Sequence, residues 1–299
     1  MAILFILFVI ILVIYFSFNS YLQHIIEVYL ENNKVKHLKP IGIDENAFIG
    51  LHKKELALKE AYMIYARKTT AYKGVILFNP DTNLTYRFYM PLINFLCRQG
   101  YIIATYQQQH RFYSKSIQDL SALYDCINND EILKTYPLFS LGHGSGALIQ
   151  LCLPLERVIQ TVGFQPRINE IDEILKLCKH KHPKVKDIII KIIQNKYSTN
   201  VNLNIINDKP TYIINGQKDE QQTIQIEHAN IKTIAELGHY PFLNNDSEQH
   251  IKSLECLLAY EDTPVFEYNK AIETFDISTL YDLNKEILDI LPLLFEYEK

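Results

Sequence analysis

The sequence predicts an α/β fold, with a mostly parallel central sheet covered by helices on both faces and preceded by one N-terminal transmembrane helix. Three observations support this prediction. Short strand-like runs alternate with helical runs through the middle of the chain, and a glycine-rich turn joins one strand directly to a helix. At the start of the chain, residues 2–23 carry no charged side chain.

The composition is that of a folded globular protein. Of the 299 residues, 48% are apolar and 21% are charged. The net charge of −4 gives no general attraction for nucleic acid, so we expect no nucleic acid partner. The five cysteines are widely spaced without a C-x-x-C pair, which favours reduced core residues over a disulfide framework or a zinc site. We expect neither a metal nor a cofactor.

The apolar run at the N-terminus is long enough to cross a membrane, because about 20 such residues span a hydrocarbon core of about 30 Å. A secretory signal is one alternative, but its basic start and small-residue cleavage pattern are missing. A helix buried in a soluble core is another. We expect a single-pass anchor over residues 1–31, in an organelle (mitochondrial) inner membrane or, alternatively, an endomembrane.

A polar linker over residues 32–50 leads into the globular domain, residues 51–262. Apolar runs with strand character alternate there with runs of helical period, which indicates a parallel sheet. We expect strands within residues 56–68, 74–80, 101–106, 137–141, 157–166, 210–220 and 230–239, and helices within residues 87–100, 116–130, 147–155 and 247–261.

Two segments stand outside this alternation. A helical, Lys-rich insertion covers residues 168–200 and suits an anionic membrane surface, an acidic partner or simply a solvated helix face. Its His180 and His182 lie two residues apart, on different sides of a helix, which argues against a metal pair. A C-terminal tail, residues 263–299, ends in an amphipathic run that must pack on its own domain or on another subunit.

The run "LGHGSGA", residues 141–147, is a glycine-rich turn with a serine between a strand and a helix, which is the context of a G-x-S-x-G motif. In that context the motif holds a catalytic serine on a strained turn. A dinucleotide-binding loop is the other interpretation, but its fingerprint follows the first strand of a fold and has a different glycine spacing. Here at least two strand–helix units come first, so we disfavour that interpretation.

Over residues 56–260 the pattern resembles the α/β-hydrolase fold, most closely hydrolases with a G-H-S-x-G-G turn. The resemblance rests on this turn, on the first strand–helix–strand unit from residue 74 to 106, and on the runs "IINGQKDE" and "IAELGHYPFL". It implies a catalytic acid at Asp219 and a catalytic histidine at His239. Read without the resemblance, Asp219 is equally a turn residue and His239 a core histidine.

The two possible alignments of the turn differ in the nucleophile. Aligning the glycines and His143 with the family pattern puts Gly144 at the nucleophile position and Ser145 one residue late. The other register makes Ser145 the nucleophile, but then His143 falls where a small residue is needed. We therefore interpret Gly144 as a vestigial nucleophile position. The run "FNPDTN" also lacks the family's usual His-Gly step.

A glycine cannot form an acyl-enzyme. We therefore expect a membrane-anchored, catalytically inactive α/β-hydrolase-fold protein that serves as an accessory or structural subunit of a membrane complex. Its contacts to the lipid bilayer and to other subunits would run through the anchor, the Lys-rich insertion or the tail. The alternative is an active serine hydrolase using Ser145, Asp219 and His239, and a third possibility is a ligand-binding module without turnover.

Overall fold

The computed structural model describes nine stretches of the chain: residues 8–18, 62–69, 71–81, 89–106, 116–166, 209–217, 228–235, 237–243 and 283–296. It also describes residues 6, 20, 21, 24 and 226, and the backbone of residues 51–55 and 113–115. The predicted Lys-rich insertion, the predicted helix within residues 247–261 and Asp219 lie outside this set. Cys178 and Cys256 do as well.

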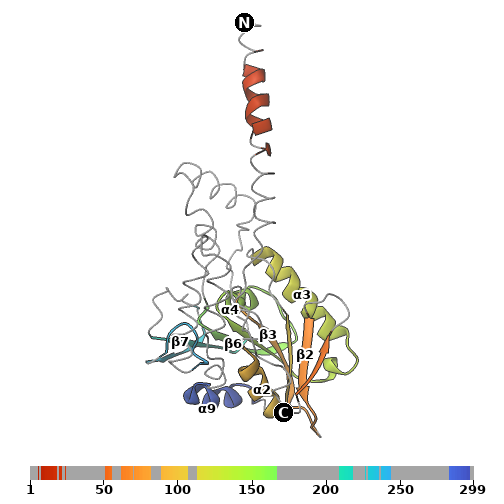
Figure 1. Cartoon of the computed structure of the whole chain (residues 1–299), viewed down its shortest axis with the longest axis vertical. Helices are drawn as coiled ribbons and strands as arrows, with labels where there is room; N and C mark the ends of the chain where they lie inside the picture. The colour runs from red at the N-terminus through yellow and green to blue at the C-terminus, as the bar shows by residue number, and fades with distance from the viewer. Residues whose placement is uncertain are drawn as a thin grey trace, which may run out of the picture.

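An eight-stranded sheet forms the centre of the molecule, in the order β1-β2-β4-β3-β5-β6-β7-β8 (Figure 1). β2 runs antiparallel to β1 and β4, and the strands from β4 to β8 pair in parallel. This is the strand arrangement of the α/β-hydrolase fold, and it confirms the mostly parallel central sheet that the sequence predicts. The strands are β1 Leu51–Glu55, β2 Tyr62–Arg67, β3 Gly74–Asn79, β4 Tyr101–Tyr106, β5 Leu138–His143, β6 Val158–Phe164, β7 Thr211–Gly216 and β8 Asn230–Ile234.

Helices cover both faces of the sheet, as the alternation of apolar runs predicts. Two separate clusters of buried side chains mark the two faces: α2 and α9 contribute to one, and α3 and α4 to the other (Figure 1). The helices are α2 Met90–Arg98, α3 Tyr113–Asn129, α4 Ser145–Leu151 and α9 Lys285–Leu294, with a short 3-10 helix at Leu133–Thr135.

The described part of the C-terminal tail packs on its own domain, which is one of the two alternatives for that segment. Asn284 caps α9 by accepting hydrogen bonds from the backbone N–H groups of the first turn. Ile287, Leu291 and Phe295 are buried in the core beneath the sheet. The Tyr101 hydroxyl also donates to the Phe295 carbonyl oxygen at 2.8 Å.

Of the described cysteines, Cys97 is buried, and Cys126 and Cys152 are half-buried. Burial raises the pKa of Cys97 to about 12 and that of Cys152 to about 11, because the thiolate would be poorly solvated there. Neither group is a ready nucleophile at neutral pH.

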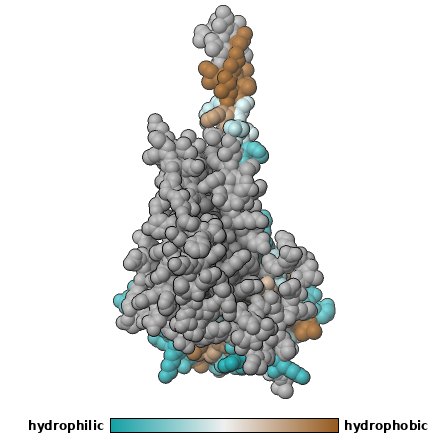
Figure 2. Space-filling view, viewed as in Figure 1, coloured by the Kyte–Doolittle hydropathy of each residue, from teal (hydrophilic) through white to brown (hydrophobic). Residues whose placement is uncertain are grey.

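An apolar helix over residues 8–18 stands apart from the sheet (Figure 1). Its large side chains are exposed all round, from 37% for Leu12 to 64% for Phe16, and Figure 2 shows them as one hydrophobic column. Within the residues that the structure describes, no helix combines the length and the apolar character needed to cross a membrane.

We predict that Leu291→Ala lowers the free energy of unfolding by about 2–5 kcal/mol, because it leaves a cavity under the sheet. Leu293→Ala in the same helix is the control: Leu293 is 64% exposed, so its loss should change stability by about 0.5 kcal/mol or less. Urea unfolding followed by circular dichroism measures both. Equal effects would mean that α9 does not pack as described.

Candidate active site

The glycine-rich turn lies where β5 ends and α4 begins. Gly144 lies at its tip with φ 54° and ψ −121°, a backbone conformation that residues other than glycine rarely adopt. Ser145 is the first residue of α4. A Cβ at Gly146 would collide with the carbonyl oxygen of Asn79, so the turn packs tightly against the end of β3.

The side-chain space beside Gly144 is filled by a carboxylate from the segment that follows β3. A Cβ built on Gly144 would lie 2.5 Å from Cγ of Asp81 and 2.7 Å from both of its carboxylate oxygens. Asp81 follows β3, which pairs with β5 and ends beside it at Asn79 and Gly142. A carboxylate therefore occupies the place into which a nucleophile at position 144 would project.

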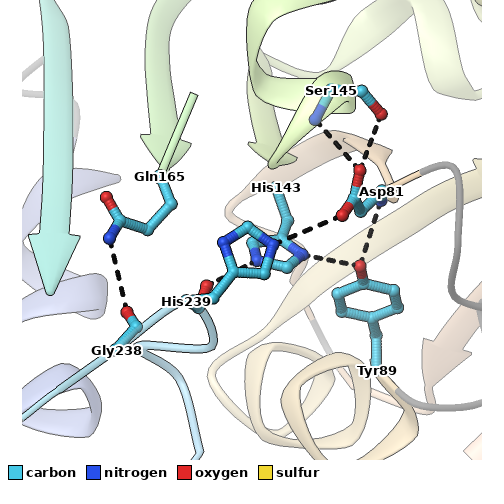
Figure 3. Close-up of polar contacts among 7 residues, drawn as sticks. All are labelled: Asp81, Tyr89, His143, Ser145, Gln165, Gly238 and His239. Carbon is cyan, nitrogen blue, oxygen red and sulfur yellow. Dashed lines mark hydrogen bonds and ion pairs between the residues drawn. The ribbon is translucent and has the colours of Figure 1, made fainter. Parts of the chain in front are cut away.

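The Asp81 carboxylate connects the turn to His239 (Figure 3). Its Oδ1 accepts hydrogen bonds from the Ser145 backbone N–H at 3.1 Å and from the Ser145 hydroxyl at 2.7 Å. Its Oδ2 lies 3.4 Å from Nε2 of His239. The carboxylate thus stands between the serine and the histidine, and the Ser145 proton points to Asp81.

All three groups are removed from water. The exposed fractions are 1% for Asp81, 1% for Ser145 and 4% for His239. A buried carboxylate is unfavourable unless donors surround it, and here two donors of Ser145 and the imidazole of His239 do so. A protonated His239 would form a buried ion pair with Asp81. Burial and mutual contact of acid and base groups are typical of catalytic sites.

Two further aromatic residues connect the loops that carry Asp81 and His239 (Figure 3). The Tyr89 hydroxyl accepts from the Asp81 backbone N–H at 3.0 Å and lies 2.8 Å from Nδ1 of His143. Nε2 of His143 lies 2.9 Å from the backbone carbonyl oxygen of His239. Neither of the two alignments of the glycine-rich turn predicted that His143 connects Tyr89 to the His239 carbonyl.

Asp81, His143 and His239 each offer one possible metal-ligating atom, and these three atoms lie within 4.8 Å of one another, as in a candidate metal site. Both ring nitrogens of His143 are already engaged, one with Tyr89 and one with a carbonyl oxygen. A metal ion would have to displace one of these partners. The arrangement is that of a hydrogen-bonded network.

Side-chain amides fix the two loops beside the site. Asn79 donates from Nδ2 to the Gly146 carbonyl oxygen at 2.8 Å, and its Oδ1 accepts from the Tyr106 hydroxyl at 2.6 Å. Gln165, whose φ is 44°, donates to the carbonyl oxygen of Gly238, next to His239, at 3.4 Å (Figure 3). The turn and the histidine loop are therefore both anchored to the carboxyl edge of the sheet.

The structure brings Gly144, Ser145 and His239 together at one edge of the sheet, and Asp219 lies outside the described residues. Sequence reasoning missed Asp81, although its position directly after a buried strand, within the unusual run "FNPDTN", was a usable signal. Tyr89 carries no such signal, since its contact with His143 depends on how α2 packs.

No family model and no curated protein matches the sequence. Solved structures resemble the fold. They include an esterase of Pyrococcus furiosus, at 15% identity and a TM-score of 0.48, covering 80% of this chain and 98% of that one. A soluble variant of a monoglyceride lipase of Saccharomyces cerevisiae matches at 14% identity and a TM-score of 0.45, covering 77% and 98%. At these values the likeness concerns the fold and says nothing of what this chain acts on.

We predict that Gly144→Ala costs about 2–4 kcal/mol of stability, because its Cβ meets the Asp81 carboxylate and the backbone is strained. In an Asp81→Ala background the same change should cost about 1–2 kcal/mol less, since the steric conflict is gone. A double-mutant cycle by urea unfolding measures this coupling. Additive effects would show that the carboxylate does not fill the space beside Gly144.

Proposed function

We propose that this chain is a hydrolase that cleaves carboxylic esters by direct attack of water, with Asp81 and His239 as its acid–base pair. The observation that carries the proposal is the buried contact between Oδ2 of Asp81 and Nε2 of His239, beside the turn where the fold otherwise holds a nucleophile. The site lies at the carboxyl ends of β3 and β5, where ligands bind in parallel α/β sheets.

The proposed reaction needs no covalent intermediate. The water oxygen attacks the ester carbonyl carbon, and the Asp81–His239 pair accepts the proton that the water loses. Collapse of the tetrahedral adduct breaks the bond to the alkoxide oxygen, which takes that proton from the pair and leaves as the alcohol. The other product is the carboxylic acid. Ser145 holds the carboxylate in place through two hydrogen bonds.

A serine route at the same site is the competing mechanism. In it the Ser145 oxygen attacks the ester after passing its proton to the Asp81 carboxylate, 2.7 Å away, and Asp219 would orient His239 as the sequence suggests. Gly144, at the tip of the turn, supplies no nucleophile in either route. The two routes differ in whether Ser145 is covalently modified.

We predict that the full chain releases p-nitrophenol from short-chain p-nitrophenyl esters, and that Asp81→Asn or His239→Gln lowers kcat/KM about 10²–10⁴-fold. Ser145→Ala should retain activity within about tenfold, and a fluorophosphonate probe should leave the chain unlabelled. Labelling that Ser145→Ala abolishes would establish the serine route instead. Wild-type turnover no higher than that of Asp81→Asn would reject the function.

A second candidate function is that of a membrane-anchored accessory or structural subunit of a membrane complex, without turnover. Two observations favour it: Gly144 has no side chain, and the helix over residues 8–18 exposes apolar side chains on all sides. An exposed column of this kind is stable only against lipid or protein. The membrane would be an organelle (mitochondrial) inner membrane or an endomembrane, and the Lys-rich insertion or the tail would contact partner subunits.

For the anchor we predict that the full chain floats with phosphatidylcholine vesicles in a density gradient and stays bound in 1 M salt. A chain lacking residues 1–31 should remain at the bottom, because the apolar column is gone. Ile10→Lys with Ile14→Lys in the full chain is the matched control and should weaken binding strongly, since both side chains are exposed apolar groups. Full-length protein that fails to float would contradict membrane attachment.

A further inference from the structure

We propose that Tyr89 and His143 are positioning residues that set the distance between Asp81 and His239, an inference that rests on the proposed function of this pair. Asp81 follows β3 and His239 follows β8, 158 residues later. Their side chains meet at 3.4 Å, a contact too long to hold the two loops in register by itself. A second connection joins the backbone N–H of Asp81 to the backbone carbonyl of His239 through the side chains of Tyr89 and His143.

The direction of each hydrogen bond in this connection follows from the two end groups, the His239 carbonyl oxygen and the Asp81 backbone N–H. A carbonyl oxygen only accepts, so Nε2 of His143 carries the hydrogen that bonds the His239 carbonyl. Nδ1 of the neutral ring is then an acceptor and takes the hydrogen of the Tyr89 hydroxyl. The Tyr89 oxygen in turn accepts from the Asp81 backbone N–H. Each of the three hydrogen bonds that connect Asp81 to His239 thus pairs a donor with an acceptor.

Packing leaves the two connecting side chains little freedom. Tyr89 and His143 are fully buried. Phe242 lies with its ring centroid 5.2 Å from that of each of them, and Tyr240 lies 5.3 Å from His143. Side chains locked by packing and by second hydrogen bonds are what hold a reacting pair to within a fraction of an ångström.

The connection therefore fixes the backbone at both reacting residues, and the His143 ring also packs against the His239 ring, with the two centroids 4.7 Å apart. A displacement of about 1 Å between catalytic groups lowers rates by about 10²-fold. Loss of the Tyr89–His143 connection should for this reason act on the chemical step more than on substrate binding. A loss in kcat without a matching change in KM would therefore distinguish a positioning role from a merely structural one.

Three variants test the connection by its parts, with hydrolysis of a p-nitrophenyl ester as the first readout. His143→Gln can replace the Nε2–H donor to the His239 carbonyl, whereas the shorter side chain of His143→Asn offers its amide to Tyr89 and does not reach that carbonyl. Tyr89→Phe removes the hydroxyl and keeps the ring. We expect His143→Asn and Tyr89→Phe to lose about 10–100-fold in kcat with KM changed less than about threefold, and His143→Gln to keep more of kcat than His143→Asn.

The second readout is nitrogen-15 NMR of the full-length protein in detergent, with labelled histidine. We expect His143 to show an unprotonated Nδ1 and a protonated Nε2 at pH 7, and the His239 resonances to move in His143→Asn more than in His143→Gln. Circular dichroism confirms that each variant is folded. A His143 protonated at Nδ1, or His239 resonances that stay in place in all three variants, would overturn the inference.

The two proposals fail in different ways. If the wild-type chain hydrolyses no ester, the proposed function fails, and the NMR result alone decides whether the connection positions His239. If the wild type is active and His143→Asn and Tyr89→Phe keep its kcat, the positioning role is wrong and the function stands.

Discussion

The carboxylate of Asp81 in the space beside Gly144 is the contact on which the site depends. It links the end of β3 to the first turn of α4 through Ser145, and it reaches His239 on the other side. A side chain at position 144 would collide with it. The glycine and the aspartate are therefore sterically matched, and the proposed chemistry depends on this match.

Under the proposed function, the reacting group changes. An α/β-hydrolase turn ordinarily presents a side-chain nucleophile from its tip. Here Gly144 at the tip has no side chain, and the carboxylate of Asp81, which follows the neighbouring strand β3, lies beside His239 instead. In the proposed reaction, this buried carboxylate and imidazole are the acid–base pair that activates water, and no acyl-enzyme forms. Tyr89 and His143 add a connection that fixes the loops carrying both groups.

The sequence predicted the parallel sheet and the helices on its faces, but not the contacts of the site. Apolar periodicity located the parallel strands, and the strand–turn–helix pattern located Gly144, while His239 was reached through the family resemblance. The polar run of β1 has no apolar pattern to find and becomes a strand by pairing with β2. Asp81 was missed although it directly follows a buried strand, and its contact with the turn depends on the side-by-side pairing of β3 with β5. Tyr89 could not be assigned a role, because its contact with His143 depends on helix packing. His143 looked too bulky for the turn, yet its ring fits among Tyr89, Tyr240 and Phe242.

The measurement that tests the central claim most directly is the intact mass of the full chain, trapped by acid quench during steady turnover of an acetate ester. Water activated by Asp81 and His239 predicts continuous ester cleavage with every protein molecule at its unmodified mass. An acetylated species that forms and decays at the rate of turnover, with the acetyl group on Ser145, would contradict the account. So would the absence of any cleavage.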